Sequence, residues 1–324
     1  MITENQKKNI SGKLKRTIFE QAILIILCVL VIVMSIFLKG FWTWNNLFNM
    51  LRQNAVLGIM ACGMTIVIIS KGIDLSSAAI LSLSAIAALK VQHLGYFALV
   101  LTAITVGLIC GLINGVIIGK IKANFLIVTL ATAILFKAAS FILSGGRNVR
   151  VDNNNVYTFI GIGNIFRIPA IAYLLVAIVL FTGILLHKSI IGRRFYLTGI
   201  NDKAALASGI NVSNISMLAY IINGVLIGIS AIALSARLPR IRVDTGSDYL
   251  FDVITIVVLG GTSLSGGVGG INKTILGFAV FILMVNGMAL LGIPYEFQQL
   301  IKGIILVSAV LYDEYSKRRR VLYI

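Results

Sequence analysis

Long apolar runs, separated by short polar stretches, restrict what this chain can fold into more than any other feature of its sequence. Hydrophobic residues make up 58% of the 324 residues and charged residues only 12%, which is more apolar surface than one soluble core can bury. A helix needs roughly 20 apolar residues to cross a bilayer, where every backbone polar group must be satisfied internally. The sequence therefore predicts an all-α, polytopic membrane protein.

Ten segments are candidate spans. Their approximate ranges are 18 to 38, 55 to 70, 75 to 89, 96 to 119, 124 to 143, 168 to 187, 214 to 236, 249 to 262, 274 to 291 and 297 to 312. The second, third and eighth are short for complete crossings. We expect these three to be broken or partly re-entrant helices that are buried against their neighbours.

The distribution of basic residues predicts the orientation. Ten spans place both termini on one side, and that side holds seventeen of the 28 Lys and Arg residues, against nine on the other. Lys137 and Lys302 lie near the outer ends of spans, where long side chains can reach the interface. Because basic residues near spans are retained in the cytoplasm, we expect both termini on that side. The chain would form a single membrane domain over 1–324 in the cell inner membrane. Its cytoplasmic ends would be 1–17 and the basic tail 314–324.

Residue patterns typical of enzymes are absent from the sequence. It has no glycine-rich phosphate loop ending in Gly-Lys-Ser/Thr, no GxSxG and no HExxH. Cys28, Cys62 and Cys110 lie in apolar runs without CxxC spacing. We therefore expect no catalytic residue, no metal and no cofactor, and the net charge of +17 reflects orientation rather than nucleic-acid binding. Any ATP hydrolysis that drives transport would have to occur in another chain.

Small residues recur at every fourth position of VGLICGLINGVIIG, at Gly107, Gly111, Gly115 and Gly119. Such a row lets another helix backbone approach closely inside lipid. Close helix packing is the simpler interpretation. The alternative is that the neighbouring Asn114 faces a substrate.

Two stretches share a pattern, TIVIISKGIDLS at 65–76 and TIVVLGGTSLSGG at 255–267. Each is a β-branched run that ends in glycine and a Leu-Ser pair, which suggests an internal parallel repeat with a translocation path at its interface; a tight turn is the alternative. Asp74 is placed to cap a helix that begins at Leu75. The polar residues considered as lining the path are Asp74, Asn114, Asp252, Thr262, Ser263 and Asn286.

A polar segment, LTGINDKAALASGINVS at 197–213, interrupts the apolar sequence. Asn201 or Asp202 can cap a short helix that Gly209 ends. A helix of about two turns is unstable alone in water, so it must dock on a partner or on the inner face of this chain. The residues predicted to couple the chain to a partner are Asn201, Asp202, Lys203, Ala204, Ala205, Leu206, Ala207, Ser208 and Gly209.

Three separated parts of the chain, in order, resemble the permease subunits of bacterial sugar-type ABC importers. They are KGIDLSSAAILSLSAI at 71–86, TGINDKAALASGINVS at 198–213, and DVITIVVLGGTSLSGGVGG with NGMALLGI and IKGIILVSAVL within 252–311. The likeness extends from about 45 to 313. That family usually reads Gly-Gly-Ile-Asp and Leu-Ser-Val-Gly, whereas this chain has Lys71-Gly72-Ile73-Asp74 and Leu75-Ser76-Ser77-Ala78.

The resemblance implies a permease that moves a monosaccharide by alternating access. Two permease chains, identical or different, would form the path, ATP-binding-cassette ATPase subunits would bind the cytoplasmic face, and an extracytoplasmic sugar-binding protein would deliver the solute. The segment 198–213 would be the coupling element seated in the ATPase. The alternatives are a permease for branched-chain amino acids or another small polar solute, and a carrier or channel that needs no ATPase.

Overall fold

The computed structural model describes residues 22–152 and 155–321, and it is helical apart from four two-residue strands. The segment 1–17, the start of the first predicted span and residues 322–324 of the tail lie outside the described residues. The helices are α2 (Ala22–Phe37), α3 (Trp44–Ile69), α4 (Ser77–Lys90), η1 (Gln92–Leu94), α5 (Tyr96–Gly115), η2 (Val116–Lys120), α6 (Phe125–Ser144), α7 (Asn155–Ile162), α8 (Ala170–Lys188), α9 (Ile190–Ile200), α10 (Asp202–Ala207), α11 (Val212–Arg237), α12 (Tyr249–Leu259), α13 (Ile271–Leu290) and α14 (Tyr295–Val321). The strands β1 (Val149–Arg150) and β4 (Arg240–Ile241) pair with each other, as do β2 (Asn164–Ile165) and β3 (Ile168–Pro169).

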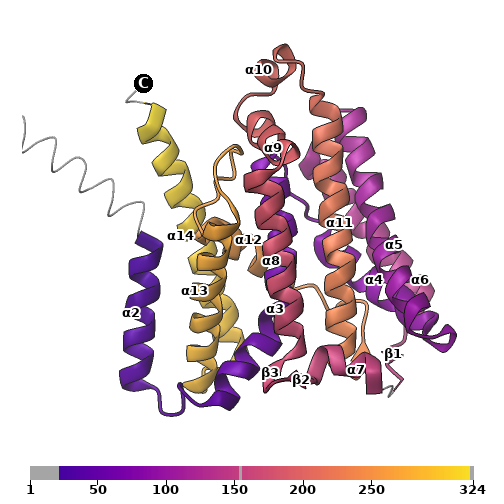
Figure 1. The fold of residues 1–324 in the computed structure, drawn as a ribbon, viewed down its shortest axis with the longest axis vertical. Helices are drawn as coiled ribbons and strands as arrows, with labels where there is room; N and C mark the ends of the chain where they lie inside the picture. The colour runs from indigo at the N-terminus through magenta and orange to yellow at the C-terminus, as the bar shows by residue number, and fades with distance from the viewer. Residues whose placement is uncertain (1–21, 153–154, 322–324) are drawn as a thin grey trace, which may run out of the picture.

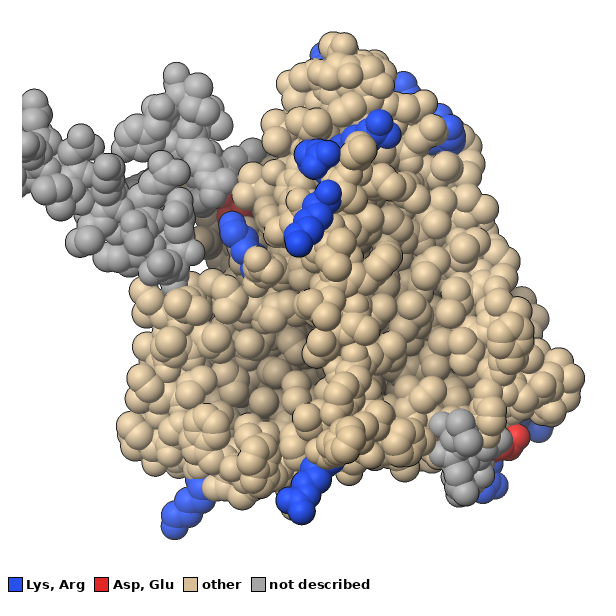
Figure 2. Space-filling model, in the orientation of Figure 1, with Lys and Arg blue, Asp and Glu red and all other residues tan. Residues whose placement is uncertain are grey.

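The long helices lie side by side in a bundle with two different ends (Figure 1). One end carries α10 and the end of α14; the other carries the end of α2, α7 and the strands β1, β2 and β3. Within the described residues, six helices are long and apolar enough to cross a membrane, namely α3, α5 with η2, α6, α8, α11 and α13, and α2, α4 and α12 are shorter apolar helices. On the face drawn in Figure 2, charged side chains gather toward the two ends and leave an uncharged band between them. The chain is therefore an all-α, multi-pass membrane protein.

Each of the ten predicted spans coincides with a helix. Three of these spans were predicted to be short, and this prediction is correct for two of them. Helices α4 and α12 are short, with 14 and 11 residues. The second span was predicted as 55 to 70 and is wrong at its start, because α3 begins at Trp44 and has 26 residues. Its first turns carry several polar residues, most of them exposed, and one of them, Asn46, bonds to Asn286 of α13.

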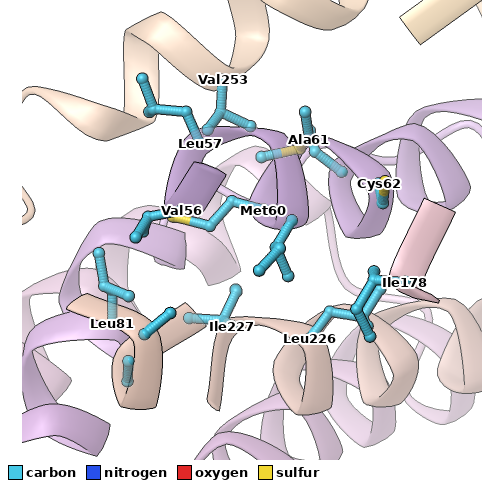
Figure 3. Packing of buried hydrophobic residues seen from close by; sticks show 14 of the residues in the cluster. Val56, Leu57, Met60, Ala61, Cys62, Leu81, Ile178, Leu226, Ile227 and Val253 are labelled. Carbon is cyan, nitrogen blue, oxygen red and sulfur yellow. The ribbon is translucent and has the colours of Figure 1, made fainter. Parts of the chain in front are cut away.

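The central element of the core is α3, in which every residue from Asn54 to Ile69 is buried. A helix that is apolar on all sides lies inside a bundle. Figure 3 shows Val56, Met60 and their neighbours on α3 among side chains of α4, α8, α11 and α12. The outer helices α5, α6 and α8 are mostly exposed, since only 28% of the apolar window of each is buried. Their outward side chains suit contact with lipid.

The four glycines of α5 and η2 lie against α11. A Cβ atom on Gly107, Gly111, Gly115 or Gly119 would overlap a backbone oxygen of that helix, and Gly224 of α11 returns the same contact toward Gly107. The two backbones are therefore in direct contact. In lipid, where the hydrophobic effect does not drive helices together, such close packing supplies the association energy.

A single methyl group tests this contact. In Gly111→Ala the new Cβ would lie 2.5 Å from the carbonyl oxygen of Tyr220, so α5 and α11 must separate. We expect a lower melting temperature of the detergent-solubilised protein, equivalent to about 1–3 kcal/mol. Gly183→Ala in α8 is the matched control, because a Cβ there meets nothing within 4 Å and alanine favours the helix. Equal melting temperatures of the two variants would contradict the packing described.

Candidate functional site

Asp74 lies at the break between α3 and α4, and its side chain is fully buried. The Oδ1 atom accepts hydrogen bonds from the backbone N–H of Ser76 at 3.0 Å and from its hydroxyl at 2.5 Å. The prediction that Asp74 caps a helix beginning at Leu75 is wrong, because α4 begins at Ser77 and its N-cap residue is Ser76. The carboxylate instead bonds two residues ahead, a local pattern common for aspartate.

Two helices reach this carboxylate with side-chain amides. Asn223 of α11 donates from Nδ2 to Oδ2 of Asp74 at 2.8 Å, and Asn114 of α5 donates to the Ser76 hydroxyl at 2.8 Å and, more distantly, to Asp74 at 3.5 Å. We call Asp74, Ser76, Asn114 and Asn223 the Asp74 cluster. A buried carboxylate is tolerated only when donors replace water, so the cluster ties the α3–α4 break to both helices. Asn114 was predicted as a site residue and Asn223 was not; an asparagine within an apolar run was the available signal.

The amide oxygens of Asn114 and Asn223 are also buried, and within the described residues neither has a hydrogen-bond partner. The Asn223 oxygen faces Gly63 of α3, where a Cβ would overlap it. An unpaired buried acceptor costs free energy. In the Asp74 cluster, the carboxylate therefore has hydrogen-bond donors, whereas the two asparagine amide oxygens have none within the described residues.

Asp252 and Lys302 form a second buried polar contact. Their atoms Oδ2 and Nζ are 2.8 Å apart, with side chains 8% and 13% exposed, and the ammonium lies 5.5 Å from the ring centroid of Phe281. The prediction that Lys302 reaches out to the interface is wrong, because the nearby carboxylate of α12 holds it inside the bundle. Lys137, by contrast, lies on the exposed side of α6.

The remaining residues predicted for the path do not converge on Asp74. Asn286 exchanges hydrogen bonds of 3.0 and 2.8 Å with Asn46, and Ser263 donates to Asp313 at 3.1 Å. Thr262 is buried, and its hydroxyl has no partner within the described residues. The structure thus brings together Asp74 and Asn114 only, out of the six. No group of three His, Cys, Asp or Glu side chains in the described part of the chain could hold a metal ion.

The polar segment forms α10, a helix of six residues at one end of the bundle. Its N-cap is Asn201, which accepts hydrogen bonds from the backbone N–H groups of Lys203 and Ala204 at 3.0 and 3.1 Å. Gly209 follows with a φ of +79°, the left-handed conformation that ends helices. The cap chosen by the structure is therefore Asn201 rather than Asp202.

Helix α10 is poorly packed on its own chain. Of its six side chains only that of Ala205 is buried, and Leu206 is 64% exposed. A cavity of about 680 Å³ lies beside it, and its lining includes Lys122, Lys203 and Ser213. The helix therefore stands off the bundle, and its Leu206 is exposed beside this cavity.

The Asp252–Lys302 pair gives a sharp stability prediction. Removing one partner leaves a buried charge unpaired, so we expect Asp252→Leu or Lys302→Met to cost roughly 3–5 kcal/mol, whereas the double variant removes both charges and costs much less than the sum. Thermal unfolding of the four proteins in detergent measures this. A double variant as unstable as the sum of the single ones would contradict a direct pair.

Known proteins resemble the chain over most of its length. The family described as branched-chain amino acid transport system / permease component matches residues 46–310. The ribose import permease of Escherichia coli is 35% identical over 304 residues, covering 92% of this chain and 95% of the relative. The ribose import permease of Bacillus subtilis is 38% identical, with 89% and 90% covered, and the L-arabinose transport system permease of Escherichia coli is 31% identical, with 93% and 92% covered. No solved structure matches the chain. With its multi-pass helical bundle, the chain therefore belongs to this family of transport-system permease components, which are transport subunits and not enzymes.

Proposed function

We propose that this chain is the membrane permease of an ATP-driven importer, and that it moves a simple sugar by alternating access. In this proposal a separate ATPase of the ATP-binding-cassette class binds α10, a second permease chain completes the path, and an extracytoplasmic binding protein delivers the sugar. The observation that carries it is the exposure of α10. The names of the ribose and L-arabinose permeases support sugar as the solute class.

The geometry of α10 favours docking on a partner over docking on this chain. A helix of six residues does not persist alone in water, and burial of one alanine supplies little packing. The exposed Leu206, Ala204 and Ala207 present a small apolar surface beside polar ends. A groove on an ATPase would bury that surface.

The position of α10 fits a cytoplasmic ATPase. It lies at the end of the bundle that also carries the end of α14 (Figure 1). The excess of Lys and Arg on the side of the termini supports a cytoplasmic location for that end. ATP and α10 would then share a compartment.

The buried charges favour a neutral solute over an amino acid. Asp252 is neutralised by Lys302, and Asp74 is surrounded by neutral donors. A zwitterionic amino acid would call for unpaired charges of both signs along its path, because desolvated ions need partners. A sugar needs hydrogen-bonding groups only.

Leu206→Asp tests the docking, with Leu94→Asp as its matched control. Both leucines are exposed, at 64% and 66%, but Leu94 lies in η1, which is joined to the β1 end of the molecule by hydrogen bonds of Gln92. A carboxylate in an apolar groove is costly. We therefore expect the ATPase activity that co-purifies with Leu206→Asp to fall more than tenfold, which corresponds to a loss of about 1.4 kcal/mol of binding free energy.

The measurement is affinity purification of the full chain from its native membranes, followed by reconstitution and uptake of radiolabelled ribose, L-arabinose or leucine. Leu94→Asp should retain ATPase and sugar uptake. Sugar uptake by the purified chain without any ATPase, or full activity of Leu206→Asp, would contradict the proposal.

A further inference from the structure

Lys71 has a backbone conformation that its residue type disfavours. It directly follows Ser70, which caps the end of α3, and its φ is 69°. Glycine adopts this left-handed region freely, whereas a residue with a Cβ pays a steric penalty there. A lysine that persists at such a position points to a role for its side chain.

The side chain of Lys71 reaches the first residue of α10. Its Nζ atom donates a hydrogen bond to Oδ1 of Asp202 at 2.8 Å. That hydrogen bond is the largest cause that lowers the pKa of the Asp202 carboxyl, so the carboxylate is charged at neutral pH. The two side chains are 50% and 54% exposed, and exposed ion pairs add little to overall stability. The ion pair therefore acts mainly on the position of α10, and it contributes little to the stability of the fold.

Four elements meet around Lys71. The carbonyl of Ile69 accepts a hydrogen bond from the backbone N–H of Gly267 at 2.8 Å, which joins the end of α3 to the loop between α12 and α13. Gly199, near the end of α9, is packed so closely that a Cβ would overlap the same carbonyl. The ion pair adds α10 to this junction. The contacts with α9 and with the loop between α12 and α13 are made by backbone atoms, whereas the link to α10 is made by the Lys71 side chain.

Asp74 is three residues after Lys71. Its carboxylate is bonded to Asn223 of α11, and the adjoining Ser76 is bonded to Asn114 of α5. The short stretch 71–74 therefore connects α10 to the Asp74 cluster. A displacement of α10 can reach the middle of the bundle through this stretch as well as through α9 and α11, which continue the chain on either side of it.

We propose that Lys71 is a positioning residue that fastens the coupling helix α10 to the α3–α4 break and transmits its movement to the Asp74 cluster. The inference rests on the proposed function, because it takes α10 to be moved by an ATPase. It assigns a role to a residue outside the segment 198–213. The link is a specific contact between side chains, so it can be broken without altering α10.

Lys71→Gly breaks the link and removes the backbone strain, so the variant should fold. Arg167→Gly is the matched control, because Arg167 is also exposed, has a φ of 69°, loses one positive charge and lies between β2 and β3, away from α10. The readout is ATP hydrolysed per ribose taken up by the native complex in proteoliposomes. We expect this ratio to rise roughly threefold in Lys71→Gly, the factor that an exposed ion pair can contribute, and to stay unchanged in Arg167→Gly.

Exchange of the two charges separates a direct contact from a structural effect. Lys71→Asp and Asp202→Lys should each raise the ratio, and the double variant should restore it, because aspartate tolerates the left-handed conformation. An unchanged ratio in Lys71→Gly and in both single exchanges would overturn the role of Lys71 while leaving ATP-driven uptake intact. Absence of ATP-dependent uptake by the native complex would overturn the proposed function and this inference together.

Discussion

The burial of the Asp74 carboxylate is the constraint around which the rest of the structure is arranged. A charge without water needs donors from the protein, and these come from the start of α4 and from helices α5 and α11. The glycine row lets α5 and α11 approach closely enough for both amides to reach the same break in the chain. Helix packing and charge compensation therefore depend on each other here.

The structure satisfies its charges in two ways. Asp74 is held by neutral groups, while Asp252 is paired with Lys302. In both arrangements, the buried carboxylate has partners, so neither Asp74 nor Asp252 is an unpaired charge. Asn46 and Asn286 add a neutral amide pair between α3 and α13. In the proposed function, such an interior suits the passage of a neutral polar solute.

Hydropathy and motif spacing predicted the helices and the position of α10, because both depend on local sequence. The Asn201 cap, for example, follows from an asparagine before a short alanine-rich stretch. Pairings across helices could not be predicted, because they depend on the depth and rotation of each helix. This is why Asn223 was missed and Lys302 was placed wrongly. The start of α3 was predicted eleven residues late because its first turns are polar, and hydropathy detects only the apolar part of a helix.

The central claim is that α10 lies in the cytoplasm and is covered by an ATPase. Cysteine accessibility tests it most directly: Ser208→Cys, in a background where the exposed Cys28 is replaced by serine, places a thiol at the exposed end of α10. With a maleimide that does not cross membranes, the account predicts labelling in inverted vesicles stripped of ATPase, protection when the ATPase is restored, and none from the outside of intact cells. Labelling of intact cells, or labelling that the ATPase leaves unchanged, would contradict it.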